Sequence, residues 1–351
     1  MKRRMFENSR MKKITAFIMC GALAAASLTG CGAQQSGSAK DTGDTAQINS
    51  ESDAVAEAYQ DSGVTMEITE NEVPLTGASA AISTTLMPTA SGKVTKGNAQ
   101  VTFDASNTAD GYVMVKYLEK TDKKLKLIVK GPSGTAYTYN INKIGSYETF
   151  PLSDGNGTYT VTAYKNISGT SYSTVYSMTL SVTLKDQFAP FLLPNQYVNY
   201  TTGSQVVKKA EELTKGQKTD LDKITSVYNW VIKNISYDKQ LAASVKSGYL
   251  PNLDQVLKKK KGICFDYAAL MTAMLRSRGI PCKLVVGYSG KAYHAWINTY
   301  TNEGGWVDSV IYFDGTSWKL MDPTYASTGR QSDAIMKYIG NGANYKAKYL
   351  Y

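Results

Sequence analysis

The chain has 351 residues, among them 39 lysines and arginines, 29 aspartates and glutamates and one histidine, so its formal net charge is +10. Residues 1–30 hold six of the basic residues and one of the acidic residues, which leaves 33 basic against 28 acidic residues, a charge of +5, in the rest. This small excess comes without a nucleic-acid-binding motif and argues against a nucleic-acid partner. A single histidine argues against a histidine-based metal site, and no glycine-rich phosphate loop is present, so we expect neither a metal nor a cofactor.

A bacterial export signal is predicted near the N-terminus. Two lysines follow Met11, and an apolar run then covers residues 14–26, which is shorter than the stretch of about twenty residues that spans a membrane. The run ends at Leu-Thr-Gly-Cys, residues 28–31, which resembles the bacterial lipobox. We therefore expect a signal peptide over residues 1–30, a lipid on Cys31, and a protein anchored outside the cytoplasm to the membrane of a bacterial cell surface.

Residues 31–90 are predicted to form the lipidated cysteine and a disordered tether. From Gly32 to about Pro88 the sequence is rich in Ser, Thr, Ala, Gln, Asp and Gly and shows no sustained apolar periodicity. Such a composition buries too little apolar surface to offset the chain entropy that folding removes. A flexible chain of this length has an r.m.s. reach of about 40 to 45 Å, so we expect the folded part to stand away from the membrane.

Residues 91–187 are predicted to form an all-β domain. Seven runs alternate between apolar or aromatic residues and polar ones, and turn sequences at 131–134 and 153–157 separate two pairs of them. Seven strands in about ninety residues are typical of an immunoglobulin-like β-sandwich. Strand propensity explains the many tyrosines, and stacking on sugar rings is the alternative. The runs are 101–103, 112–117, 124–130, 136–140, 147–150, 158–164 and 176–184.

Residues 188–351 are predicted to form a second domain in which helices precede a sheet. Apolar residues recur with helical spacing over 204–214 and 221–233, and the region 254–278 is expected to hold a short helix and then a longer buried one. The segment 338–351 is expected to be an edge or packing segment. The sheet is expected to consist of the runs 281–288, 294–301, 305–313 and 317–321, which gives an α+β arrangement.

Cys264 lies where the buried helix is expected to begin. It follows a glycine turn at Gly262 and precedes a helix-forming stretch. At a helix N-terminus the unpaired N–H groups and the macrodipole lower the pKa of a thiol, and a neighbouring imidazolium lowers it further. Cys264 is therefore the candidate nucleophile, and His294, the only histidine, is the candidate neighbour.

His294 and Asp322 are both expected on strands. His294 lies at the start of residues 293–300, an alternating run rich in aromatic and β-branched side chains. Asp322 ends a second run, which Pro323 stops just after the carboxylate. A thiol on a helix, with an imidazole and a carboxylate on neighbouring strands, is the arrangement of a nucleophile, its base and the group that orients the base.

Four motifs in order make the chain resemble the transglutaminase-like superfamily: Gly-Ile-Cys at 262–264, Gly-Ile-Pro at 279–281, His-Ala-Trp at 294–296 and Asp-Pro at 322–323. The resemblance covers about residues 205–325 and implies a papain-like core. By the same resemblance Cys264 matches the nucleophile, His294 the base and Asp322 the third member. The residues expected to support them are Gly262, Tyr267 and Trp296.

The resemblance also implies a reaction: acyl transfer through a thioester at Cys264, which water or an amine then releases. Relatives include transglutaminases, proteases, amidases and inactive members. We expect a monomeric enzyme acting on amide bonds of surface proteins or cell-wall peptides. Hydrolysis and cross-linking both stay open, because the outcome depends on how well the site excludes water. The alternative function is a non-catalytic surface adhesin or scaffold built on the same fold.

Two further features bear on Cys264. Cys282 and Lys283 stand where many relatives carry a small residue and an arginine, and in an exported protein Cys282 could instead form a disulfide with Cys264. That disulfide would leave the motifs around His294 unexplained. The lysine run 258–261 is typical of a solvated helix end or turn, and the alternative is a positive potential that holds the thiolate or attracts an acidic substrate.

Overall fold

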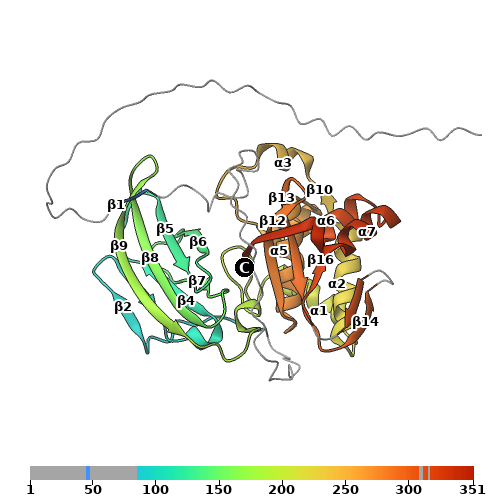
Figure 1. Ribbon diagram of the computed structural model, residues 1–351, viewed down its shortest axis with the longest axis horizontal. Coiled ribbons are helices and arrows are strands. Elements are labelled where there is room, and N and C mark those ends of the chain that lie inside the picture. Colours follow the sequence, from blue (N-terminus) through green and yellow to red (C-terminus); the bar gives the residue numbers. More distant parts are fainter. Residues whose placement is uncertain (1–44, 48–84, 308–310, 315–316) are drawn as a thin grey trace, which may run out of the picture. The chain divides into compact units, whose positions relative to one another are not determined.

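The computed structural model describes residues 45–47, 85–307, 311–314 and 317–351 (Figure 1). The predicted signal peptide, the predicted lipid site Cys31 and nearly all of the predicted tether lie outside these residues. The described residues contain no helix with the length and apolarity needed to span a bilayer.

The N-terminal part of the described chain forms two sheets in which all neighbouring strands are antiparallel (Figure 1). The five-stranded sheet has the order β1 (Thr45–Gln47), β9 (Ser171–Val182), β8 (Gly157–Ser168), β5 (Leu125–Lys130) and β6 (Ala136–Asn140). The four-stranded sheet has the order β2 (Thr95–Gly97), β3 (Val101–Asp104), β4 (Tyr112–Tyr117) and β7 (Glu148–Pro151).

Alternation along these strands explains which side chains are buried. In β8, Tyr159, Val161 and Ala163 are buried, whereas Thr158 and Thr160 are exposed, because successive side chains point to opposite faces of a sheet. All seven predicted runs lie in or across strands, so the prediction of an antiparallel β-rich region is confirmed. β2 was not predicted because it is short and exposed throughout. The immunoglobulin-like assignment and the domain boundaries stay predictions.

The C-terminal part combines helices with a four-stranded antiparallel sheet. The helices are α1 (Gln205–Thr214), α2 (Asp220–Asn234), α3 (Lys239–Ser244), α4 (Leu253–Lys259), α5 (Cys264–Arg276), α6 (Pro323–Thr328) and α7 (Asp333–Gly340). The sheet has the order β16 (Lys319–Met321), β13 (Ala292–Thr299), β12 (Cys282–Ser289) and β17 (Tyr345–Leu350). A two-residue parallel pair joins β10 (Ser236–Tyr237) to β11 (Lys261–Gly262).

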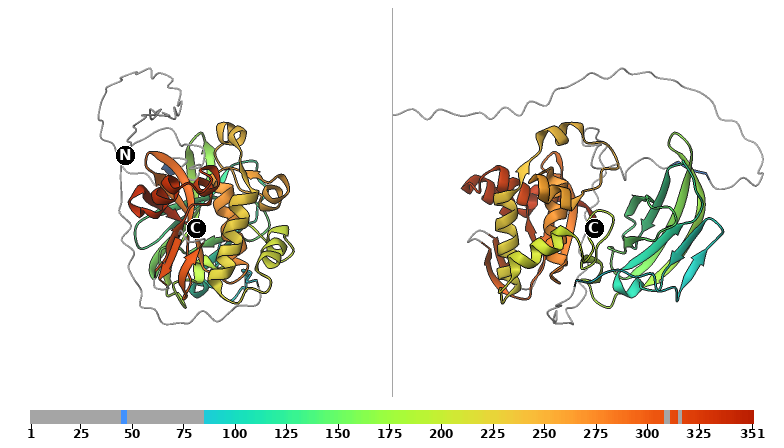
Figure 2. Two further views of the ribbon diagram at one scale, coloured as in Figure 1. Left: turned by 90° about the vertical axis from the view of Figure 1, so that its right-hand side faces the viewer. Right: turned by 180° about the vertical axis from the view of Figure 1, so that it is seen from behind.

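Helix α5 is the centre of this part. It packs on β12 and β13 on one side and on α1 and α2 on the other (Figure 2), and every residue from Phe265 to Arg276 is buried. A helix that is apolar on all sides needs such an enclosed position. The first residue of α5, Cys264, is only partly buried. The helix thus runs from the buried core to a partly exposed N-terminal residue.

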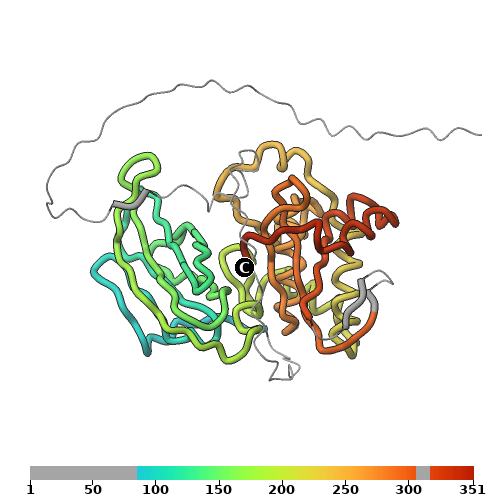
Figure 3. Tube along the Cα trace, in the orientation of Figure 1, coloured from blue at the N-terminus to red at the C-terminus, as the bar shows by residue number. Residues whose placement is uncertain are grey.

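The prediction that residues 305–313 form a strand of the main sheet is wrong. β14 (Gly304–Val307) and β15 (Ile311–Asp314) pair with each other as a separate hairpin, and the fourth strand of the main sheet is β17. Gly305 lies against Leu221 of α2, so closely that a Cβ at this glycine would stand 2.4 Å from a Leu221 methyl carbon. The hairpin therefore packs on α2, and the chain returns after α7 to pair β17 with β12 (Figure 3).

Arg276 at the end of α5 is fully buried and holds three separate segments together. Its guanidinium donates to the carbonyl oxygens of Cys282 at 2.8 Å, Leu193 at 2.7 Å and Tyr351. Burial lowers its pKa to about 10, which leaves the group charged at neutral pH. Arg276 therefore connects α5 to β12, to the segment before α1 and to the end of β17.

Candidate active site

The turn before α5 places Cys264 at the start of the helix. Gly262 pairs in parallel with Tyr237, and a Cβ at this glycine would stand 2.5 Å from the Cβ of Asp266. The Asp266 carboxylate accepts the Ile263 amide at 2.9 Å, which caps the helix start. Only glycine fits this approach, so the predicted supporting position Gly262 has a direct steric reason.

Asp266 is a residue that the sequence analysis missed. It is fully buried, and its second oxygen accepts the Tyr249 hydroxyl at 2.7 Å. Burial raises the pKa of Asp266, and the hydrogen bonds from Tyr249 and Ile263 oppose that rise. The usual capping signal is absent because an isoleucine, not a serine or threonine, stands three residues before it.

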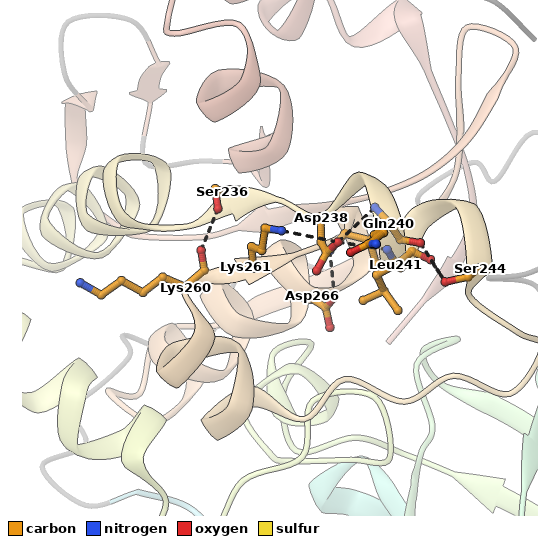
Figure 4. Close-up of polar contacts among 9 residues, drawn as sticks. Ser236, Asp238, Gln240, Leu241, Ser244, Lys260, Lys261 and Asp266 are labelled. Carbon is orange, nitrogen blue, oxygen red and sulfur yellow. Dashed lines mark hydrogen bonds and ion pairs between the residues drawn. The ribbon is translucent and has the colours of Figure 1, made fainter.

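The lysine run 258–261 lies at the end of α4 and in β11, and all four lysines are exposed. Lys260 has a positive φ of 51° and ends the helix, and its carbonyl accepts the Ser236 hydroxyl (Figure 4). The Lys261 ammonium lies 4.0 Å from Asp238, which caps α3 (Figure 4). The run therefore forms a solvated helix end, and Lys261 faces Asp238.

His294 lies on β13, and Asp322 lies just past the end of the adjacent strand β16, not on the strand as predicted. Asp322 directly follows β16, which pairs with β13, and its Oδ2 lies 2.7 Å from Nε2 of His294. Its Oδ1 accepts the Tyr325 amide at 3.0 Å and so caps α6, in which Pro323 is the first residue. Asp322 has no exposed surface, and 5% of His294 is exposed. Both carboxylate oxygens of Asp322 therefore accept hydrogen bonds in a site that is buried from solvent.

The Cys264 side chain also hydrogen-bonds His294. Asp322 occupies Nε2, which leaves the other ring nitrogen, Nδ1, available to the sulfur. Burial by itself lowers the pKa of His294, but the charge and hydrogen bond of Asp322 and the contact with Cys264 together raise it well above its usual 6.5. The structure thus brings together the three candidate residues, and its charge distribution favours an imidazolium at the sulfur.

Aromatic rings enclose the imidazole. Tyr325 stacks on it with centroids 4.4 Å apart and planes 12° apart, and Trp296 lies nearly parallel at 6.3 Å. The predicted supporting residue Trp296 therefore lies beside His294. The predicted supporting residue Tyr267 does not bond His294. Its hydroxyl donates to the Ile235 carbonyl at 2.6 Å and so joins α5 to the end of α2.

Tyr345 is a second residue that the sequence analysis missed. Its hydroxyl donates to Oδ2 of Asp322 at 2.9 Å. The sequence placed residues 338–351 at an edge, and β17 is indeed an edge strand of the sheet. No local signal distinguishes Tyr345 among 25 tyrosines, since its partner is 23 residues away along the chain.

Cys264 and Cys282 are both free. The Cys282 sulfur lies 3.5 Å from the Thr272 hydroxyl, and Thr272 follows Cys264 by eight residues on α5. Eight residues of helix span about 12 Å, whereas a disulfide needs Cα atoms within about 7 Å. The geometry therefore favours two separate thiols over the disulfide considered from the sequence.

Iodoacetamide is expected to alkylate Cys264 in the native protein and to reach Cys282 only after denaturation. Cys282 is fully buried, and burial raises its pKa to about 11, whereas Cys264 is partly exposed. Mass spectrometry of the two cysteine peptides measures the difference. Modification of Cys282 in the native protein, or of Cys264 only after reduction, would contradict this expectation.

Comparisons with known proteins show a likeness to one family over part of the chain. Residues 207–309 match the transglutaminase-like superfamily. The kyphoscoliosis peptidase of Homo sapiens is 28% identical over 127 residues, which are 36% of this chain and 19% of that protein. Uncharacterized protein ML0607 of Mycobacterium leprae is 29% identical over 181 residues, which are 46% of this chain and 60% of that protein.

Among solved structures, red sea bream transglutaminase aligns with 65% of this chain and 53% of its own, at 13% identity and a TM-score of 0.24. The chain thus covers less than two thirds of the length of each of these three proteins. The family match includes Cys264 and His294, and Asp322 follows it. The likeness to the transglutaminase-like superfamily is thus carried by residues 207–309 of this chain.

Proposed function

We propose that the chain is a cysteine-dependent enzyme that attacks the carbonyl carbon of amide bonds and forms a thioester at Cys264. The observation that carries the proposal is the single histidine, which bonds the Asp322 carboxylate at 2.7 Å on one side and the Cys264 side chain on the other. A nucleophile, a base and an orienting acid in this order are what acyl transfer through a thiol requires.

In the proposed reaction the Cys264 sulfur forms a bond to the carbonyl carbon while His294 holds the thiol proton. The imidazolium then gives this proton to the leaving amine as the C–N bond breaks. The amides of Cys264 and Phe265 lie in the first turn of α5, where helix geometry offers them no intrahelical acceptor. They are suited to bind the oxyanion of the tetrahedral intermediate.

The thioester is resolved by water, which gives hydrolysis, or by a primary amine, which gives a cross-link. We propose proteins or cell-wall peptides of the bacterial surface as substrates, with the chain anchored through a lipid on Cys31 and working as a monomer without a cofactor. The β-rich region at 91–187 is proposed to be an immunoglobulin-like sandwich that spaces or docks the catalytic domain at 188–351.

The direct test is the replacement of Cys264 by alanine. We expect the variant to lose all thioester formation with a glutamine-containing peptide probe, because no other exposed thiol lies at the site among the described residues. Cys282→Ala is the matched control and should keep the activity, since Cys282 is buried away from His294. Intact mass spectrometry after acid quench detects the acyl-enzyme, and a fluorescent alkylamine reports whether an amine can release it.

Equal behaviour of wild type and Cys264→Ala would refute the enzyme and favour the alternative, a non-catalytic adhesin or scaffold on the same fold. If Cys264→Ala is inactive, comparison of cell-wall fractions from cells carrying each form identifies the substrate, because cleaved or cross-linked products appear only with the wild type.

A further inference from the structure

Tyr345 belongs to the edge strand β17, which follows the four sequence motifs of the site along the chain. It pairs with Ser289 across the sheet, and its side chain is buried beside Trp296 with ring centroids 5.0 Å apart. Its hydroxyl reaches Oδ2 of Asp322 at 2.9 Å. This is the same oxygen that bonds Nε2 of His294 at 2.7 Å.

The ring of Tyr345 is fixed by packing. Trp296 covers it on one side, and Tyr338 of α7 lies 6.0 Å away in an edge contact. The Tyr338 hydroxyl is engaged by Ser289 at 3.1 Å. The Tyr345 hydroxyl thus reaches Asp322 from a ring that is packed between Trp296 and Tyr338.

We propose that Tyr345 is a positioning residue of this site, whose hydroxyl shares Oδ2 of Asp322 with His294 and so limits how strongly the carboxylate holds the imidazole. This inference deepens the proposed function, and it concerns the orienting end of the site, away from the sulfur. A carboxylate that accepts two donors on one oxygen offers less charge to each of them.

The sign of the effect follows from the groups around the pair. The imidazole faces Asp322 and Cys264 and stacks on Tyr325, and Asp322 accepts hydrogen bonds from Tyr345, from His294 and from the Tyr325 amide. Of these donors to Asp322, Tyr345 is the one side chain that is neutral. Its removal leaves more of the carboxylate charge for the imidazolium, so the pKa of His294 should rise.

A higher pKa would make the imidazolium a weaker acid toward the leaving amine. Tyr345 therefore keeps the His294 imidazolium acidic enough to release its proton to the leaving amine. This role differs from a purely structural one because it changes the pKa of His294. Tyr345 acts on His294 indirectly, since its hydroxyl bonds Asp322 and not the imidazole.

The test uses the single histidine of the chain, because the full-length protein labelled with ¹³C at the histidine ring gives one imidazole signal. We expect Tyr345→Phe to move the titration midpoint of His294 upward by about half a pH unit or more. Tyr288→Phe is the matched control: it removes a hydroxyl from an exposed tyrosine of the same sheet, whose ring contacts Tyr293, and it should leave the midpoint in place.

An unchanged or lowered midpoint in Tyr345→Phe would overturn the proposal. If that variant does not fold, 3-fluorotyrosine placed at position 345 is a stronger donor of the same shape and should lower the midpoint, and a midpoint that stays or rises would overturn the proposal. The NMR result does not depend on catalysis, so it separates this inference from the fate of the proposed enzyme. In an active protein, the alkaline limb of the pH profile for thioester formation should move in the same direction as the midpoint.

Discussion

Replacement of Asp322 by asparagine is expected to lower the second-order rate constant for thioester formation by about 10³- to 10⁴-fold. Asparagine keeps the shape and can still accept the Tyr325 amide, but it removes the charge that raises the pKa of His294 and that holds the Nε2 proton. The imidazole then loses both its orientation and its positive charge beside the sulfur. Acyl-enzyme formation followed against time measures the change.

Asp254→Asn is the matched control, because its carboxylate accepts the Val206 amide at 3.0 Å on α1 and does not bond the imidazole. It should change the rate less than about threefold, within the range of ordinary surface substitutions. A rate for Asp322→Asn within tenfold of the control would mean that the carboxylate does not orient the base.

The same substitution has a consequence for stability. The folded-state pKa of His294 lies above its usual 6.5, so the stabilisation from the pair is complete below pH 6.5 and is lost as the pH rises through the folded-state pKa. The free energy of unfolding of the wild type should therefore fall across that window. In Asp322→Asn this part of the pH dependence should disappear.

Replacement of Arg276 by methionine is expected to lower the free energy of unfolding by about 2 to 4 kcal/mol. The guanidinium is fully buried and donates to carbonyls of three segments, so its loss leaves buried acceptors without that donor. Methionine keeps most of the volume, which separates the lost hydrogen bonds from a cavity effect. Urea unfolding, with the slope checked for two-state behaviour, measures the difference.

Arg278→Met is the control two residues further along the chain. Arg278 is partly exposed and lines an open surface depression with Lys208 and Glu211, so its replacement should change the unfolding free energy by less than about 0.5 kcal/mol. Equal stability of the two variants would show that the three carbonyls find water or other partners when Arg276 is absent.

The positions of most elements could be predicted from the sequence because each carries its own local signal. Alternation identified the seven β runs, and 3.6-residue spacing identified α1 and α2. The sequence analysis assigned the run 305–313 to the main sheet. An alternating run indicates a strand, but it does not identify the strand with which it pairs. In the structure β14 pairs with β15, and Gly305 of β14 lies against Leu221 of α2.

At the candidate site the sequence pointed to Cys264, His294 and Asp322 through motifs, and the structure brings these side chains together. Asp266 and Tyr345 could not be found in the same way. Asp266 caps a helix whose N-cap residue is isoleucine, and Tyr345 reaches Asp322 only because β17 pairs with β12.

The sequence by itself determined where α5 begins and which thiol stands there, because a glycine turn and a helix-forming run are local properties of the chain. Tertiary structure decided which groups meet the imidazole, how far Cys282 lies from Cys264, and that one oxygen of Asp322 serves both His294 and Tyr345. The physical reason is that hydrogen bonds between distant residues depend on sheet register and core packing, which the whole chain sets together.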